Sequence, residues 1–190
     1  MRKFCAAVLA IGILFSFGSI NAKADVKAEL KSVAESKIKT WSQNPKVIAA
    51  IKAQNKKHKS MAEAEIIKLD KKWRAETSTS DKPFINSVLA NELSAFLKGV
   101  KKNAGGLFTE IFVMDNKGMN VGQSDITSDY WQGDEAKWKK TYLVGANAVH
   151  IGKVKKDEST QTFQSQVSLS ISDGGKVIGA VTVGVNMDEL

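Results

Sequence analysis

The sequence predicts an α+β fold in which helices occupy the first half of the chain and antiparallel strands the second half. Residues 25–103 place apolar side chains at the spacing of amphipathic helices, whereas residues 104–190 are rich in β-branched residues and alternate apolar with small or polar ones. Because the helical and strand segments are not interleaved, we expect the helices to pack on one side of a sheet of about five strands. Residues 25–190 are expected to form one domain.

Four sequence features mark the helices. Residues 26–42 carry an apolar stripe with a period of about 3.6, which predicts an amphipathic helix. Asn44-Pro45 combines a helix-capping residue with proline at the first helical position, so a second helix is expected to begin there. Ser60 and Glu63 have the spacing of a capping box and predict a third helix. Pro83 opens a fourth, expected to continue to Val100.

The strands are bounded by turn sequences. Asp115-Asn-Lys-Gly118 separates two short strands, and Asp173-Gly-Gly175 joins the last two strands of the chain. Between these two turns in the sequence, residues 134–140 are expected to form a short helix. The expected strands are residues 107–114, 119–122, 148–154, 162–171 and 176–185.

Residues 1–24 read as a secretory signal peptide. Arg2 and Lys3 precede an uncharged apolar run, and Ala22-Lys-Ala24 supplies the small residues of a cleavage site, so cleavage is expected before Asp25. The alternative is an uncleaved membrane anchor, for which the 17-residue run is at the short limit. The protein is therefore expected to be periplasmic.

Charge is unevenly distributed. Residues 25–103 carry 17 basic and 9 acidic side chains, and residues 104–190 carry 8 and 11. The lysines of the first half stand at helical spacing without interleaved aromatic residues, which favours solvated helix faces over nucleic-acid binding. The only cysteine, Cys5, lies in the signal segment, so the mature chain has no thiol for catalysis or metal binding.

No catalytic or cofactor motif is found. His58 and His150 are the only histidines, and neither stands in a metal-ligand or catalytic pattern. Walker, dinucleotide-binding and nucleophile-elbow motifs are missing. The sequence therefore predicts a binding protein that is not an enzyme and that needs no metal or cofactor.

The second half resembles the extracytoplasmic Cache (PDC) sensor domains. The stretch FVMDNKGMNVGQSDITSDYWQGDEAKW, the later VHIGKVKKDEST and the final IGAVTVGVNMDEL carry this resemblance. They contain a strand ending in D-x-x-G, a loop with an aromatic pair and a closing hairpin. The resemblance covers residues 26–190 and implies a PAS-like sheet preceded by a long helix.

The resemblance implies that a small polar metabolite, such as an organic acid, amino acid or amine, binds between the sheet and the loop that crosses it. By position, Tyr130 and Trp131 match the aromatic pair of that loop, and Asp157 matches an acidic residue of amine-binding members. Thr127, Ser128 and Asp129 stand where many amino-acid-binding members place an arginine, which puts α-amino-acid recognition in doubt.

The loop residues leave several interpretations open. Four carboxylates surround the aromatic pair and would suit a cationic or hydrogen-bonding ligand; they are Asp125, Asp129, Asp134 and Glu135. The alternatives are an acidic loop with Trp131 in the core, and a calcium loop, whose spacing does not fit. Trp138 either closes the pocket or anchors the short helix, and Asp157 is either a ligand contact or a turn residue.

The sequence thus predicts a periplasmic sensor-type protein that binds a small polar metabolite and presents it to a membrane receptor or kinase. Its expected ligand contacts are Asp129, Tyr130, Trp131, Trp138 and Asp157. The alternative is an interaction module without a metabolite, in which the basic helices dock to a partner protein or an anionic envelope surface.

Overall fold

The computed structural model describes residues 18–156 and 162–190. The helical half contains α1 (Gly18–Val33), a π-helical segment (Ala34–Ile38), α2 (Lys39–Ser42), α3 (Pro45–Lys57), α4 (Glu63–Thr77), α5 (Pro83–Leu89) and α6 (Glu92–Asn103). The second half contains β1 (Phe108–Met114), β2 (Asn120–Gln123), α7 (Ala136–Lys139), β3 (Val149–Ile151), β4 (Lys155–Lys156), β5 (Phe163–Asp173), β6 (Lys176–Asn186) and a terminal 3-10 turn (Met187–Glu189). The predicted α+β fold class is confirmed.

The strands form one antiparallel sheet of six strands in the order β2-β1-β6-β5-β3, with β4 also paired to β5. About five strands were expected. The predicted strand 148–154 is observed as β3 alone, and β4 is an additional short strand just beyond it. The amide of Gly152 still donates to the carbonyl of Gln166, at 2.8 Å; the chain then leaves the ladder and pairs with β5 again at Lys155 and Lys156.

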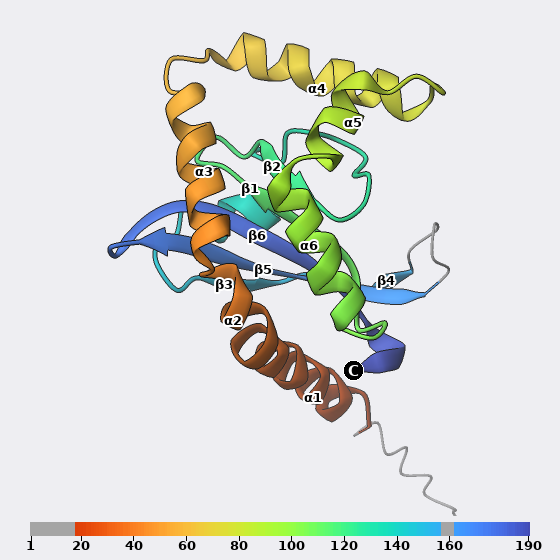
Figure 1. Ribbon diagram of the computed structural model, residues 1–190. Coiled ribbons are helices and arrows are strands. Elements are labelled where there is room, and N and C mark those ends of the chain that lie inside the picture. Colours follow the sequence, from red (N-terminus) through yellow and green to blue (C-terminus); the bar gives the residue numbers. More distant parts are fainter. Residues whose placement is uncertain (1–17, 157–161) are drawn as a thin grey trace, which may run out of the picture.

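The main core lies between the helices and one face of the sheet. In Figure 1, α1, α3 and α6 lie across that face, whereas α4 lies at one end of the molecule. Alternate residues of each central strand point toward the helices because strand side chains alternate between faces. The core residues from these strands are Ile111, Val113, Val167, Leu169, Ile171, Val181, Val183 and Val185, and the helices contribute Leu30, Ile38, Val47, Ile51, Leu93 and Leu97 among others.

Two smaller apolar clusters complete the packing. One lies under α4 and α5 and includes Trp73, Ile85 and Tyr130. The other places Trp138 of α7 against Phe112 and Met114 on the sheet face opposite the main core. Helix α7 therefore covers part of that second face and leaves the rest open.

Two helix boundaries differ from the sequence expectation. The capping box predicted at Ser60 does not form: α4 begins after Ala62, which has no side-chain acceptor, and only the Glu65 carboxylate caps the helix, by accepting the amide of Ala62 at 2.8 Å. The single helix expected from Pro83 to Val100 is interrupted, and Asn91 caps α6 by accepting the amide of Ser94 at 2.8 Å. Asn91 also donates to the carbonyl of Val121 at 2.9 Å, so the interruption ties the helices to β2.

The predicted signal segment lies mostly outside the described residues. Helix α1 begins at Gly18 and continues through the predicted cleavage point before Asp25. None of the helices within the described residues is both long and apolar enough to span a membrane. Cleavage before Asp25 stays a prediction.

We expect Gly179→Ala to lower the free energy of unfolding by about 2 kcal/mol, because the added methyl group overfills the site. A Cβ at Gly179 would collide with the carbonyl oxygen of Met114 and would lie 3.1 Å from the Ile51 side chain. The matched control is Gly99→Ala in α6, where a Cβ meets nothing within 4 Å. That control should stabilise the helix by about 0.5–1 kcal/mol. Urea unfolding measures the free energy of unfolding of both variants. A similar change in Gly179→Ala and Gly99→Ala would contradict the prediction.

Candidate functional site: a polar hollow on the open face of the sheet

A hollow of about 970 Å³ lies on the sheet face opposite the main core. Its floor is formed by side chains that alternate with the buried apolar residues of the strands. These are Glu110 and Phe112 of β1, Gln164 and Gln166 of β5, and His150 of β3. Segments 126–140 and 152–156 form the walls. The site is thus assembled from segments far apart in the sequence on a rigid sheet.

The wall formed by residues 126–137 carries two carboxylates that already have partners. Asp129, which is 8% exposed, accepts a hydrogen bond from Arg74 Nη2 at 3.1 Å and another from Gln132 Nε2. Glu135 pairs with Lys137 at 3.1 Å, and Lys137 Nζ also donates to Gln132 Oε1 at 2.9 Å. This wall is therefore a connected network whose charges are largely neutralised within the protein.

The carboxylate of the floor is engaged as well. Gln166 Nε2 donates to Glu110 Oε1 at 2.9 Å. Above the floor, the ammonium group of Lys137 lies 5.2 Å from the centre of the Phe112 ring, a cation–π arrangement.

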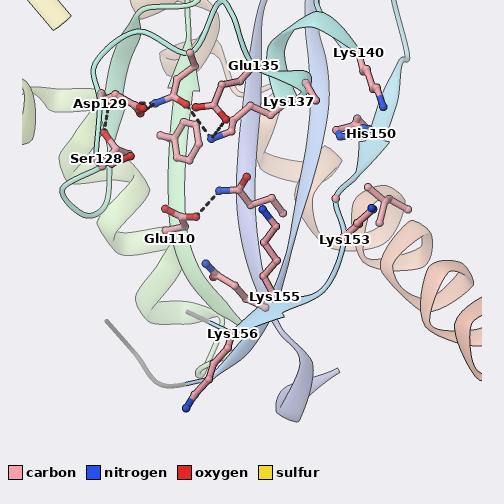
Figure 2. Close-up of a pocket in the computed structure, with 18 of the residues that line it drawn as sticks. Glu110, Ser128, Asp129, Glu135, Lys137, Lys140, His150, Lys153, Lys155 and Lys156 are labelled. Carbon is pink, nitrogen blue, oxygen red and sulfur yellow. Dashed lines mark hydrogen bonds and ion pairs between the residues drawn. The ribbon is translucent and has the colours of Figure 1, made fainter. Parts of the chain in front are cut away.

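The opposite wall is positively charged. Lys140, Lys153 and Lys155 line the hollow there together with His150, and Lys156 lies at the rim (Figure 2). Among the residues that the structure describes, no carboxylate pairs with any of these four lysines. Burial, and then the positive charge of Lys140, lower the pKa of His150 below its usual value. This wall therefore offers positive charge to an incoming group.

Tyr130 and Trp131 lie next to the hollow but do not line it. The Tyr130 ring is 3% exposed and lies 5.6 Å from Trp73 and 4.9 Å from Phe84, centre to centre. Trp131 Nε1 donates to the carbonyl of Lys117 at 2.8 Å. Both rings belong to the cluster under α4 and α5. Burial raises the pKa of the Tyr130 hydroxyl well above its ordinary value.

The other three residues predicted to contact the ligand, Asp129, Trp138 and Asp157, differ in their position relative to the hollow. Asp129 lines the hollow, whereas Trp138 is packed on the sheet, stacks on Tyr142 with ring centres 4.8 Å apart, and donates to the carbonyl of Asp115 at 3.1 Å. Asp157 lies outside the described residues and directly follows Lys156, which lines the hollow. The binding roles of all five residues stay predictions.

The remaining acidic residues of the loop do not converge on a metal site. Asp125 pairs with Lys101 at 2.6 Å, which draws it away from Asp129 and Glu135. Within the described residues, no group of three His, Cys, Asp or Glu side chains is arranged to hold an ion. The calcium-loop alternative therefore has no geometric support there.

Sequence reasoning missed Lys153 and Lys155 of the lysine wall and the glutamine floor. Gln164 and Gln166 alternate with buried residues of β5, and this alternation was visible in the sequence as a polar face of the strand. Nothing in the sequence shows that this face is enclosed by α7 and by residues 152–156. The pairing of β3 and β4 with β5 creates that enclosure.

No protein-family model matches the chain, and no curated protein matches it either. Among solved structures, it is similar to the ligand-binding domain of the Campylobacter jejuni chemoreceptor Tlp3 in complex with 4-methylisoleucine, with 14% identity and a TM-score of 0.40 over 94% of this chain and 65% of that one. It is also similar to the sensor domain of the V. cholerae histidine kinase DctB, with 11% identity and a TM-score of 0.39 over 89% of this chain and 56% of that one.

A third similar structure is the ligand-binding domain of the Pseudomonas aeruginosa amino acid chemoreceptor PctC in complex with GABA, with 10% identity and a TM-score of 0.38 over 88% of this chain and 61% of that one. The chain spans less than two thirds of each of these three structures. Two of these structures are ligand-binding domains of chemoreceptors, and one is the sensor domain of a histidine kinase.

Proposed function

We propose that this protein is a periplasmic binding protein that is not an enzyme, holds a small polar metabolite in the hollow on the open sheet face, and presents it to a membrane receptor or kinase. One observation carries the proposal: polar and charged side chains from β1, β3, β5 and segment 126–140 converge on a single cavity of about 970 Å³. Pockets that bind small molecules are typically concave, few per protein and lined by a small number of oriented polar groups. The resemblance of residues 107–190 to Cache domains implies a ligand site between the sheet and the loop that crosses it, and this supports the proposal.

Export is part of the same proposal. A signal peptide removed before Asp25 would deliver residues 25–190 to the periplasm. Expression of the full chain in a bacterium and mass spectrometry of the periplasmic fraction test this point directly. A mature protein that begins at Asp25 is the expected product, and full-length protein retained in the membrane fraction would contradict it.

Thermal unfolding of the exported protein in the presence of organic acids, amino acids and amines tests the binding function. A ligand at 100 times its Kd stabilises the native state by about 2.7 kcal/mol. For a domain of this size, that corresponds to a rise in Tm of about 5–10 °C. We expect at least one compound class to produce it.

Two variants locate the binding site. Gln166→Leu changes the floor of the hollow and should remove the ligand-induced shift, whereas Gln43→Leu, at an exposed position near the end of α2, should leave it intact. Trp131→Ala and Asp157→Ala test the residues expected from the sequence. A shift that survives Gln166→Leu but disappears in Trp131→Ala would place the ligand beside the aromatic cluster instead.

A further inference from the structure

The charges that surround the hollow are segregated. Figure 2 shows Ser128 and Asp129 on the side opposite Lys140, His150 and Lys153, with Lys155 extending between the two walls. The three carboxylates of the hollow, Glu110, Asp129 and Glu135, each accept a hydrogen bond or ion pair from a neighbouring side chain. Lys140, Lys153 and Lys155 have no carboxylate partner among the described residues. The positive charge that remains available therefore lies on one wall.

We infer that the hollow takes a ligand with at least two anionic groups, carboxylate or phosphate, held by Lys140, Lys153 and Lys155 beside His150. This inference rests on the proposed function and specifies its ligand. A zwitterion such as an α-amino acid also needs an acceptor for its ammonium group, and each described carboxylate of the hollow already accepts from a side chain of the protein. A multiply charged anion needs only donors, which the lysine wall supplies.

The physical chemistry of lysine supports this assignment. An ammonium group is a compact charge on a flexible stem with three donors, so several lysines can adjust to one anion without a fixed fork geometry. A single exposed ion pair contributes little free energy to binding, because water screens the attraction between the two charges. Several like charges on the wall of a concave site focus the field and attract an anion more strongly than the same charges on an open surface. One ligand that contacts all three lysines also relieves their mutual repulsion.

Isothermal titration at an ionic strength of about 0.15 M, where the Debye length is about 8 Å, with two probes, inorganic pyrophosphate and citrate, tests the inference. At least one of them is expected to bind, whereas glycine and glycerol at the same concentrations are not. Preference for pyrophosphate would assign the site to phosphoryl groups, and preference for citrate would assign it to carboxylates. The double variant Lys153→Gln/Lys155→Gln should weaken binding about tenfold or more.

The matched control is Lys46→Gln/Lys57→Gln, which removes the same charge from exposed positions of α3. It should change the affinity less than about threefold, since exposed charges beyond a Debye length are screened. His150 gives a second readout. An anion bound beside it favours the imidazolium form, so the pKa of His150 measured by NMR titration should rise when the probe is added.

Three results would overturn the inference. The first is an equal loss of affinity in the α3 control, which would indicate diffuse charge attraction without a site. The second is a His150 titration that the bound anion leaves unchanged. The third is the failure of both anions to bind. If both anions fail but glycine or another zwitterion produces a stabilisation that Gln166→Leu removes, the proposed function stands and only the inferred ligand class is wrong. If no compound produces such a stabilisation, the inference and the proposed function both fail.

Discussion

Asp115→Ala is expected to lower the free energy of unfolding by about 3–5 kcal/mol, because it removes a buried charged acceptor and leaves its donors without partners. The Asp115 side chain is fully buried. Its Oδ1 accepts the amides of Lys117 and Met119, at 2.8 and 2.9 Å, and thereby closes the turn between β1 and β2. Its Oδ2 accepts Gln54 Nε2 at 3.0 Å and lies 3.5 Å from Nδ1 of the buried His58. One carboxylate therefore connects this turn to α3.

Urea unfolding followed by circular dichroism measures this loss. Asp115→Asn retains an acceptor for the two turn amides, so it should lower the free energy of unfolding by less, about 1–2 kcal/mol. The control is Asp173→Ala in the turn between β5 and β6, where the carboxylate is 40% exposed and pairs with Lys52. An exposed pair of this kind contributes less than about 1 kcal/mol. Comparable losses at Asp115 and Asp173 would show that burial of the Asp115 carboxylate does not govern its effect.

The fold was predictable wherever local pattern and tertiary packing agree. The apolar stripes and Asn44-Pro45 located α1 to α3, and the alternation in residues 162–185 located the long hairpin of β5 and β6. The boundaries that differ depend on contacts between distant segments. Asn91 interrupts the fourth predicted helix while its side chain donates to Val121, 30 residues away. The end of the predicted strand 148–154 at Ile151, and the separate strand β4 beyond it, depend on pairing with β5.

The site was predictable to the level of the segment but not of the side chain. Residues 126–140 do form a wall of the hollow, and Asp129 lines it. The aromatic pair faces α4 because Asp70, 60 residues earlier, holds the backbone of that pair in place. A single sequence carries no signal for such a long-range contact. The same limit applies to the lysine wall, whose members appear in the sequence as ordinary charged residues near a turn.

The contact between α4 and the loop leads to a second large effect. Asp70 Oδ1 accepts the backbone amides of Tyr130 and Trp131, at 2.9 and 3.0 Å. Its Oδ2 accepts Arg74 Nε at 2.6 Å, and Arg74 Nη2 continues to Asp129, which lines the hollow. The positive charge of Arg74 is favoured by these carboxylates, and the pKa of Arg74 is raised mainly by its hydrogen bond to Asp70. Asp70 is thus one link between helix α4 and the wall of the site, beside Trp73, whose Nε1 donates to the carbonyl of Thr127 at 2.8 Å.

We therefore expect Asp70→Ala to lower the free energy of unfolding by about 3 kcal/mol, since two largely buried amides and one guanidinium contact lose their acceptor. Glu63→Ala, at an exposed acidic position in the same helix, removes an equal charge and should cost no more than about 0.5 kcal/mol. Hydrogen exchange gives a local readout: the amides of Tyr130 and Trp131 should lose protection in Asp70→Ala before the strands of the sheet do. Ligand-induced stabilisation should fall in the same variant, because the backbone of the loop and the Arg74 side chain that holds Asp129 lose the Asp70 acceptor. If those amides stay protected and the stabilisation is unchanged, the packing of Trp73, Phe84 and Tyr130 positions the loop, and the Asp70 carboxylate has no part in shaping the hollow.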